Sequence, residues 1–352
     1  MLPVDDKPAT TDRLKRVLFG APRNLADRSI FHRISLIPIL AWVGLGADGL
    51  SSSAYGPDEA FRTLFLPDGQ SHAYLALGLA AMTAVTVFVI AAAYSRIIEE
   101  FPKGGGGYLV ATKLLGPRVG MVSGCALLVD YVLTITVSIA AAGDAIFSFL
   151  PADWVPLKLP LEVIFILILI TLNIRGVRES VLSVAPIFAL FVVTHLILIL
   201  GGIIAHAPQI PTTARTVGSG FQNGLATLGA GGMFLLFIHA YSLGGGTYTG
   251  IEAVSNAMPI MREPRVQTGQ RTMLYMATSL AFTAAGLLVC YLLWDVAPDP
   301  EHRKTMNAVL VERFAHGIPF GEAFVVLTLF SEGALLVVAA QAGFIGGPPV
   351  LA

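Results

Sequence analysis

The hydrophobic positions of this chain fall into long runs that are separated by short polar segments. A helix rises about 1.5 Å per residue, so about 20 apolar residues are needed to cross a hydrocarbon core about 30 Å thick. Each long run therefore predicts one transmembrane helix. The uninterrupted runs lie at about 74–98, 119–150, 159–174, 182–205, 273–296 and 320–342.

Two further apolar runs are interrupted. The first, at about 34–66, is broken at 46–53, and the sixth, at about 225–258, is broken at 243–247. With them the chain is predicted to have about eight spans. An alternative interpretation is that their glycines only allow close helix packing. A broken helix, however, is tolerated at bilayer depth only where its backbone faces protein or water. Two such breaks therefore predict a lined cavity.

The two broken spans share a short sequence pattern. After each break a tyrosine is followed four residues later by Glu-Ala, with Tyr55 and Glu59 in the first span and Tyr248 and Glu252 in the sixth. Five spans separate the copies, and an odd number of spans inverts the second copy relative to the first. We therefore predict an inverted repeat whose discontinuous helices meet near the bilayer midplane.

Lysine and arginine are concentrated on one side of the predicted spans, at 7–33, 96–118, 175–178 and 262–271. Cytoplasmic loops are enriched in these residues. We therefore predict a multi-pass protein of the cell membrane with both ends in the cytoplasm. The polar tail 1–33 lacks the apolar core and cleavage site of a signal peptide, so it is predicted to stay in the cytoplasm. The other side has only Lys158, Arg215, Arg303, Lys304 and Arg313, with Arg62 near the outer end of the first span.

The composition agrees with a bilayer protein and excludes several other classes. The chain is 55% hydrophobic and 13% charged, with a mean hydropathy of +0.74, whereas soluble domains carry about 25% charged residues. A net charge of -1 argues against nucleic acid as a partner. Two cysteines and seven dispersed histidines predict no disulfide framework, no metal site and no enzyme. His195 and His239 lie within spans and are interpreted as packed side chains.

Three acidic residues lie within the predicted spans. Asp48 is in the first break, Asp130 is in the third span, and Glu252 follows the second break. Ionisable groups at bilayer depth are costly, and no basic residue lies at comparable depth to offset these three. The acids therefore predict a site that attracts a cation. Alternatives remain for two of them: Asp130 could orient a neighbouring helix end, and Glu252 could bind protons without touching the substrate.

Hydroxyl groups surround these acids in the sequence. Tyr131, Thr134 and Ser138 share one face of the third span, because positions three, four and seven apart align on a helix. Tyr55 and Thr249 follow the two breaks. Hydroxyl oxygens and the free carbonyls predicted at 47–52 and 244–247 can replace the water shell of an alkali cation. The alternative is that the serine and threonine hydroxyls bond to their own helix carbonyls and that the tyrosines are ordinary span aromatics.

A more specific signal comes from four ordered motifs: DGLSSSAYG at 48–56, FPKGGGGY at 101–108, LLVDY at 127–131 and TGIEAVSNA at 249–257. In these motifs the chain resembles the amino acid–polyamine–organocation superfamily and, within it, the KimA-type potassium importers of the KUP group. The resemblance implies an all-α, LeuT-like inverted-repeat bundle and proton-coupled potassium uptake without a cofactor. Glu252 and Asp48 are also implied in proton coupling. By motif match, the implied potassium site comprises Asp48, Tyr55, Asp130, Tyr131, Thr134, Ser138, Thr249 and Glu252.

The chain departs from the five-plus-five plan of this superfamily. Residues 34–206 are predicted to form the first repeat of five helices and 207–352 an incomplete second repeat of three. We therefore expect either a fragment of a longer transporter or a truncated product. The predicted partners are potassium, protons and the lipid bilayer. A homodimer is expected only if the full-length protein has a cytosolic C-terminal domain.

Two other functions compete with potassium uptake. An amino acid permease of the same superfamily would bind a substrate carboxylate, which Asp48, Asp130 and Glu252 would repel. A non-transporting sensor or assembly subunit would give no flux from the full-length gene product. Uptake of labelled amino acids with no potassium dependence would reject the first hypothesis.

Overall fold

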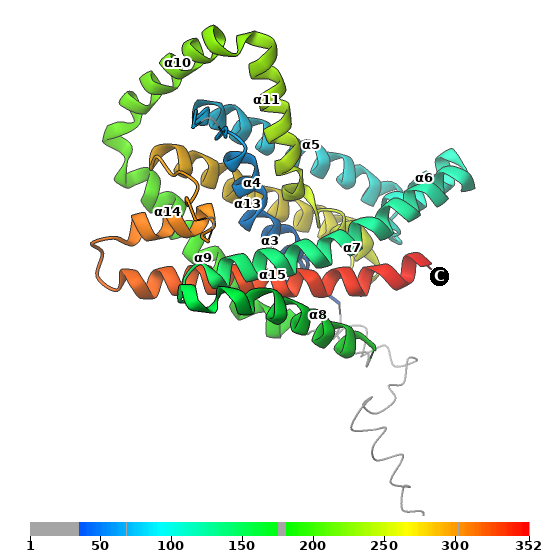
Figure 1. The fold of residues 1–352 in the computed structure, drawn as a ribbon. Helices are drawn as coiled ribbons and strands as arrows, with labels where there is room; N and C mark the ends of the chain where they lie inside the picture. The colour runs from blue at the N-terminus through cyan, green and yellow to red at the C-terminus, as the bar shows by residue number, and fades with distance from the viewer. Residues whose placement is uncertain (1–34, 68, 175–180, 302, 352) are drawn as a thin grey trace, which may run out of the picture.

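The computed structural model describes residues 35–67, 69–174, 181–301 and 303–351, and the predicted tail 1–33 lies outside them. The regular secondary structure of the described residues is helical apart from two isolated bridges, Leu36 with Met261 and Phe65 with Ser71. The predicted all-α class is thereby confirmed. Figure 1 shows the helices crossing one another in a single bundle.

The first broken run forms α3 (Pro38–Ser51), η1 (Ser52–Ala54) and α4 (Gly56–Arg62). The following elements are η2 (Ala73–Leu75), α5 (Ala76–Glu100), α6 (Gly106–Leu115), α7 (Pro117–Phe147), η3 (Ala152–Leu157), α8 (Lys158–Ile174) and α9 (Val181–Ala205). The remainder comprises η4 (Ala207–Gln209), α10 (Ile210–Thr227), α11 (Gly229–Leu243), η5 (Gly244–Tyr248), α12 (Ala253–Asn256), η6 (Met258–Ile260), α13 (Arg265–Leu293), α14 (Met306–Ala315) and α15 (Gly321–Leu351).

The number of long apolar helices is lower than the predicted eight. Among the described residues, six helical segments are long and apolar enough to cross a membrane, and they coincide with the six uninterrupted runs. A seventh is obtained if α10 and the segment Gly229–Asn256, which meet at 115°, count as one span. The first broken run is missing from this set because neither α3, with 14 residues, nor α4, with 7 residues, is long enough alone.

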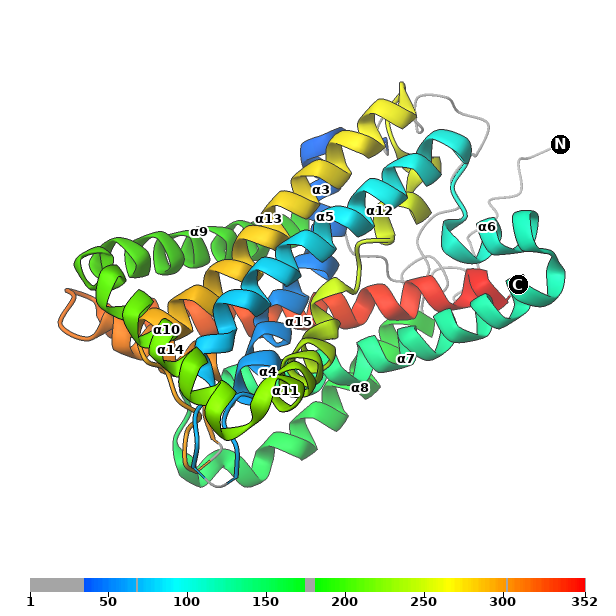
Figure 2. The same cartoon turned by 90° about the horizontal axis from the view of Figure 1, so that it is seen from above.

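Two helix pairs form the frame of the bundle. α5 packs along α13, and α7 packs along α15 (Figure 2). The broken helix α3 lies between them and contacts α9, α13 and α15. α13 carries many fully buried side chains, among them Met276, Leu280 and Leu287. The interior therefore surrounds α3 and α13, and this arrangement places the first break deep inside the protein.

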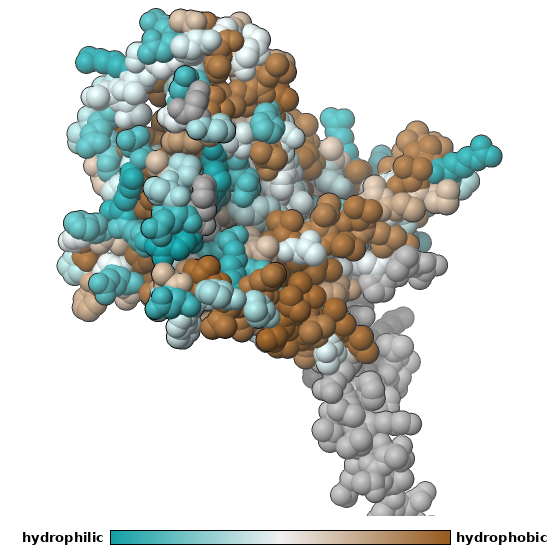
Figure 3. All heavy atoms as spheres, viewed as in Figure 1, coloured by the Kyte–Doolittle hydropathy of each residue, from teal (hydrophilic) through white to brown (hydrophobic). Residues whose placement is uncertain are grey.

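The outer helices expose apolar side chains, as expected in a bilayer. α8 has only one buried residue, Leu169, whereas Ile164, Phe165 and Ile168 are exposed. Figure 3 shows a continuous hydrophobic surface over this part of the molecule. Such a surface would be unfavourable in water, and lipid tails would cover it at no cost.

The first break is shorter than predicted. The interruption was predicted at 46–53, but α3 remains helical through Ser51, and the chain becomes a 3-10 turn only at Ser52–Ala54. Gly46 and Gly49 serve close packing instead. A Cβ atom on Gly46 would lie 3.3 Å from the Phe188 ring, and one on Gly49 would lie 3.2 Å from the sulfur of Met276. For these two glycines the packing interpretation is the right one.

Two helices between the spans were not predicted from the hydrophobic pattern. α10 contains Thr, Ser, Gln and Asn side chains and has only one buried residue, Gly224. α14 begins at Thr305, whose hydroxyl accepts a hydrogen bond of 3.1 Å from the backbone N–H of Ala308. Neither helix carries an apolar run of about 20 residues, so the hydrophobic pattern does not predict them.

Candidate functional site

The two broken segments face each other inside the bundle. The Ser52 hydroxyl donates to the Thr247 carbonyl at 2.8 Å and approaches the Gly49 carbonyl at 2.6 Å. Gly250, whose φ is +82°, lies directly on the first span: a Cβ atom there would be 2.8 Å from the backbone nitrogen of Gly49. Only glycine combines this conformation with so close an approach. The breaks are therefore in backbone contact.

The second break is the more open of the two. After η5, Thr249 adopts an extended conformation, with φ -65° and ψ 149°, and a turn leads into the four-residue α12. This interruption runs further along the chain than the predicted 243–247. The carbonyl oxygens of Gly246 and Thr247 accept side-chain hydrogen bonds rather than only helical ones. The sixth span thus offers backbone oxygens to the interior.

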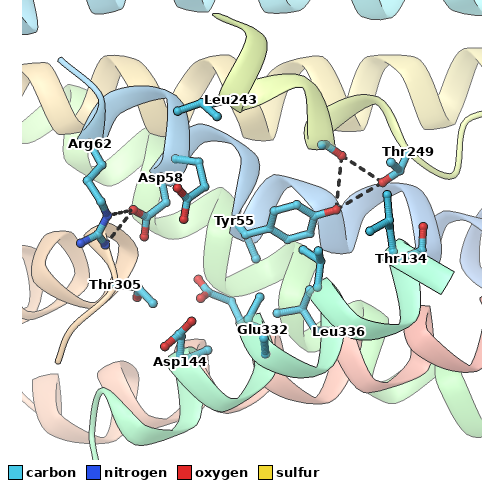
Figure 4. Close-up of a pocket in the computed structure, with 18 of the residues that line it drawn as sticks. Tyr55, Asp58, Arg62, Thr134, Asp144, Leu243, Thr249, Thr305, Glu332 and Leu336 are labelled. Carbon is cyan, nitrogen blue, oxygen red and sulfur yellow. Dashed lines mark hydrogen bonds and ion pairs between the residues drawn. The ribbon is translucent and has the colours of Figure 1, made fainter. Parts of the chain in front are cut away.

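Two predicted hydroxyls meet at this second break. The Tyr55 hydroxyl lies 3.4 Å from the Thr249 hydroxyl and 3.4 Å from the Gly246 carbonyl (Figure 4). The Thr249 hydroxyl donates to the same carbonyl at 2.9 Å. The structure therefore brings together Tyr55 of the first span and Thr249 of the sixth, which the sequence separates by 194 positions.

The three predicted acids also come within electrostatic range of one another. Asp48 is close enough to Glu252 and to Asp130 for their negative charges to repel. Glu252 lies near the backbone N–H of Gly250 as well as its own. Within the described ranges, none of the three forms an ion pair with lysine or arginine. Their carboxylates nevertheless do not converge tightly enough, in that part of the chain, to form a metal-binding cluster.

α7 presents its predicted hydroxyl face to the interior. Thr134 and Ser138 are buried, together with Ala142 and Ala145 one and two turns further on. Tyr131 is half-buried and lies in the electrostatic range of all three acids. The face that was predicted from the helical spacing is therefore the face that α7 buries.

Tyr94 of α5 is a site residue that the sequence analysis missed. Its phenol lies in the electrostatic range of Glu252 and Asp130. The signal for it was weak, because a single tyrosine near the end of an apolar run is common at membrane interfaces. Only the packing of α5 against α12 and α13 shows that it faces the acids.

A cavity of about 800 Å³ reaches the site. Four predicted residues line it, namely Tyr55, Asp130, Thr134 and Thr249, whereas the other four do not. Asp48, Tyr131, Ser138 and Glu252 are partly or fully buried and do not line this cavity. The predicted set is thus divided into a cavity-facing group and a deeper group. Tyr55 lines the wall and also contacts the second break.

Part of the remaining cavity wall carries charged side chains, which the site predicted from the sequence does not include. Asp58 pairs with Arg62 at 2.9 Å and accepts a hydrogen bond of 2.8 Å from the backbone N–H of Met306 (Figure 4). Asn307 donates to the Ala54 carbonyl at the end of the first break, at 3.0 Å. These hydrogen bonds hold the start of α14 against α4 and against the 3-10 turn that precedes α4. The spacing of Asp58 and Arg62, four apart on a helix, was the available signal.

The cavity wall also includes Asp144, Glu332, Arg303 and Lys304. Arg303 and Lys304 belong to the loop side that carries few basic residues, and Lys158, the ion-pair partner of Asp144, lies on the same side. The cavity therefore extends from the two breaks toward the side opposite the predicted cytoplasmic loops.

A bundle of apolar helices with two interior breaks and a cavity that reaches them is the architecture of a multi-pass membrane permease. Comparison with known proteins agrees. A family model described as amino acid permease matches residues 64–345, so the chain belongs to the amino acid permease family.

The chain is also similar to the potassium transporter KimA of Bacillus subtilis (strain 168). The two are 32% identical over 338 residues, which cover 95% of this chain and 53% of KimA. The chain therefore spans about half the length of this relative. The predicted resemblance to the superfamily and to its KimA-type members is confirmed.

Proposed function

We propose that this chain is the membrane part of a transporter that takes up potassium together with protons across the cell membrane. The observation that carries the proposal is the group of three mutually repelling carboxylates beside two broken helices, with no basic side chain paired to them among the described residues. A monovalent cation or a proton is what would relieve this repulsion. The similarity to the potassium transporter KimA supports potassium as the cation.

In the proposed site, potassium is held by Asp48, Asp130 and Glu252 together with oxygens of both breaks. Tyr55 and Thr249 are already in contact there, and the Gly246 carbonyl lies between them. Tyr131, Thr134 and Ser138 complete the set from α7. Because the carboxylates do not form a tight cluster, we infer that they draw together when the cation enters. Asp48 and Glu252 are proposed to exchange the coupled proton.

The proposed topology follows the inverted repeat, with 34–206 as the first repeat and 207–352 as part of the second. The pairing of α5 with α13 and of α7 with α15 supports it, since these are the second with the seventh span and the third with the eighth.

In the orientation proposed from the basic loops, with the N-terminus in the cytoplasm, the cavity opens to the outside. Lipid surrounds the bundle, and a second copy is proposed only for a longer protein with a cytosolic domain.

An amino acid permease is the second candidate, and the family description favours it. An amino acid carboxylate would have to lie beside the three acids, and this repulsion is what argues for a cation instead. A non-transporting sensor is the third candidate and requires the absence of flux.

The test is uptake of the potassium analogue rubidium by the full-length gene product, in cells that lack their own potassium uptake. We expect growth at low potassium and rubidium influx that Asp130→Asn reduces by about tenfold or more, as for loss of a charged ligand. Thr136→Val is the matched control on α7, because its hydroxyl bonds to Val132 and Leu133 of its own helix and is exposed. Influx of labelled amino acids without rubidium influx would contradict the proposal, and so would the absence of any flux.

A further inference from the structure

A buried histidine–carboxylate pair joins α9 to α15. The Nε2 atom of His195 lies 3.0 Å from Oε1 of Glu332, and both side chains are 1% exposed. From the sequence, His195 is interpreted as a packed side chain, and Glu332 carries no prediction. The structure shows instead that each is the other's partner across 137 positions of sequence.

The hydrogen bonds of His195 determine how many protons the pair holds. Its Nδ1 atom lies 2.9 Å from the Phe191 carbonyl, which can only accept, so Nδ1 carries a proton. One further proton must lie between Nε2 and Oε1, because two lone pairs would otherwise face each other. The pair is therefore either imidazolium with carboxylate or imidazole with carboxylic acid. Both forms are neutral, and gaining or losing one proton leaves a net charge inside the bundle.

Glu332 also borders the cavity described above, so protons can reach the pair from its water (Figure 4). Two nearby carboxylates are already paired, Asp58 with Arg62 and Asp144 with Lys158. The other charged or titratable groups near the pair are Tyr291 of α13, which lies in electrostatic range of Glu332, and the cavity residues Glu59 of α4, Asp130 of α7, and Arg303 and Lys304 before α14. Asp48 lies on α3, which packs against both α9 and α15. None of these forms the short contact with Glu332 that His195 does, within the described residues.

The pair is packed against the first broken span. Phe191 stacks on the His195 ring with centroids 3.9 Å apart. Phe191 and Leu335, neighbours of the pair on α9 and α15, belong to one buried cluster with Ala47 and Leu50 of α3. Ala47 directly precedes Asp48. A shift between α9 and α15 would therefore move the part of α3 that carries the deepest proposed ligand.

We propose that His195 and Glu332 form a proton-binding site, distinct from Asp48 and Glu252, whose loading from the cavity controls the packing of α9 and α15 on the first broken span. The proposal rests on the proposed function, since it gives the coupled proton a second binding place. A net charge on side chains that are 1% exposed is poorly hydrated, so a change of protonation favours a shift of α9 against α15.

The test separates potassium binding from proton coupling. Full-length protein is reconstituted in vesicles with a permeant anion to hold the membrane potential near zero. One unit of inward pH gradient should raise rubidium accumulation about tenfold if one proton accompanies each cation. In Glu332→Gln and His195→Gln we expect this accumulation to be lost, while rubidium exchange at equal pH stays within about twofold of wild type. Thr328→Val is the matched control, because its buried hydroxyl bonds to Phe324 of its own helix.

Accumulation that persists in both variants would overturn the proposal, and so would loss of exchange in folded variants. If neither single variant reaches the membrane, the double variant His195→Gln/Glu332→Gln carries the test, because two amides can keep a hydrogen bond across the same contact.

A second measurement does not depend on transport. Infrared spectra of the purified protein should contain a Glu332 band, from the carboxylate or the carboxylic acid according to the form of the pair, that Glu332→Gln removes and His195→Gln shifts. An unchanged band would overturn the proton site. If the wild-type protein showed the Glu332 band but no rubidium flux, the proposed transport function would be overturned and the proton-binding site would stand.

Discussion

The first and the sixth span carry the same short pattern, yet their breaks differ in structure. In the first span, three consecutive hydroxyls brace the turn: Ser51, Ser52 and Ser53 each bond to the carbonyl three residues earlier, at 2.6 to 2.7 Å. In the sixth span the backbone is extended at Thr249 and left-handed at Gly250. The first break is therefore closed by its own side chains, whereas the second leaves carbonyl oxygens for other partners.

This difference indicates that the two breaks contribute different kinds of ligand to the proposed site. In the proposed site the first span contributes two side chains, Asp48 from the last turn of α3 and Tyr55 from the residue after the 3-10 turn. The sixth span supplies backbone oxygens and Glu252 on a segment held in place mainly by contact with the first. A shared sequence pattern thus indicates a shared place in the fold and not an identical backbone.

The largest effect is expected at the point where the two breaks touch. Gly250→Ala places a methyl group 2.8 Å from the Gly49 nitrogen at a φ of +82°, so we expect transport to be abolished. The left-handed conformation alone costs about 1–2 kcal/mol in a residue with a side chain. Gly245→Ala is the control within the same break, since nothing lies within 4 Å of its added methyl. Equal rubidium uptake by the two variants would refute the close contact.

A smaller loss of uptake is expected at Glu252, which can be compared with Glu59 at the equivalent position of the first span. Glu252→Gln should lower rubidium uptake by about tenfold or more, because it removes one of the three carboxylates of the proposed site. Glu59→Gln, at the equivalent position of the first span, should stay within about twofold, because Glu59 is exposed at the cavity wall. Initial uptake rates measured at matched expression levels test the difference. If Glu59 proved the more sensitive of the two, the assignment of roles would be reversed.

A smaller effect is expected where side chains of both breaks meet. Tyr55→Phe and Thr249→Val each remove one member of a 3.4 Å hydroxyl contact. In a double-mutant cycle on the rubidium half-saturation constant, we expect a coupling of about 0.5–1.5 kcal/mol, as for one hydrogen bond. Strictly additive changes would mean that the two hydroxyls act independently of each other.

The smallest effect is expected on protein stability, for the serine hydroxyls that bond to carbonyls at the first break. Ser52→Ala loses a bond to the sixth span as well as one within its own turn, whereas Ser53→Ala loses only the bond to Leu50. We expect about 1 kcal/mol of destabilisation for Ser52→Ala and less for Ser53→Ala, visible as a lower thermal midpoint of the purified protein. The opposite order would show that the contact between the breaks contributes little to stability.

Much of this could be predicted from the sequence, because lipid imposes simple rules on it. The six uninterrupted runs each became a helix, since a spanning segment must satisfy its own backbone hydrogen bonds. The inward face of α7 with Thr134 and Ser138 followed from helical spacing alone. The extent of the first break did not follow, because Gly46 and Gly49 are compatible with either a break or close packing, and only Phe188 and Met276 decide between the two.

The sequence by itself determined the class of protein, the six long spans and the position of the three acids along them, because hydrophobic length and residue type act locally. The tertiary structure decided which polar groups meet: Tyr55 with Thr249, Asp58 with the start of α14, and His195 with Glu332. These contacts join residues more than 130 positions apart. They depend on how helices cross, and no local pattern contains that information.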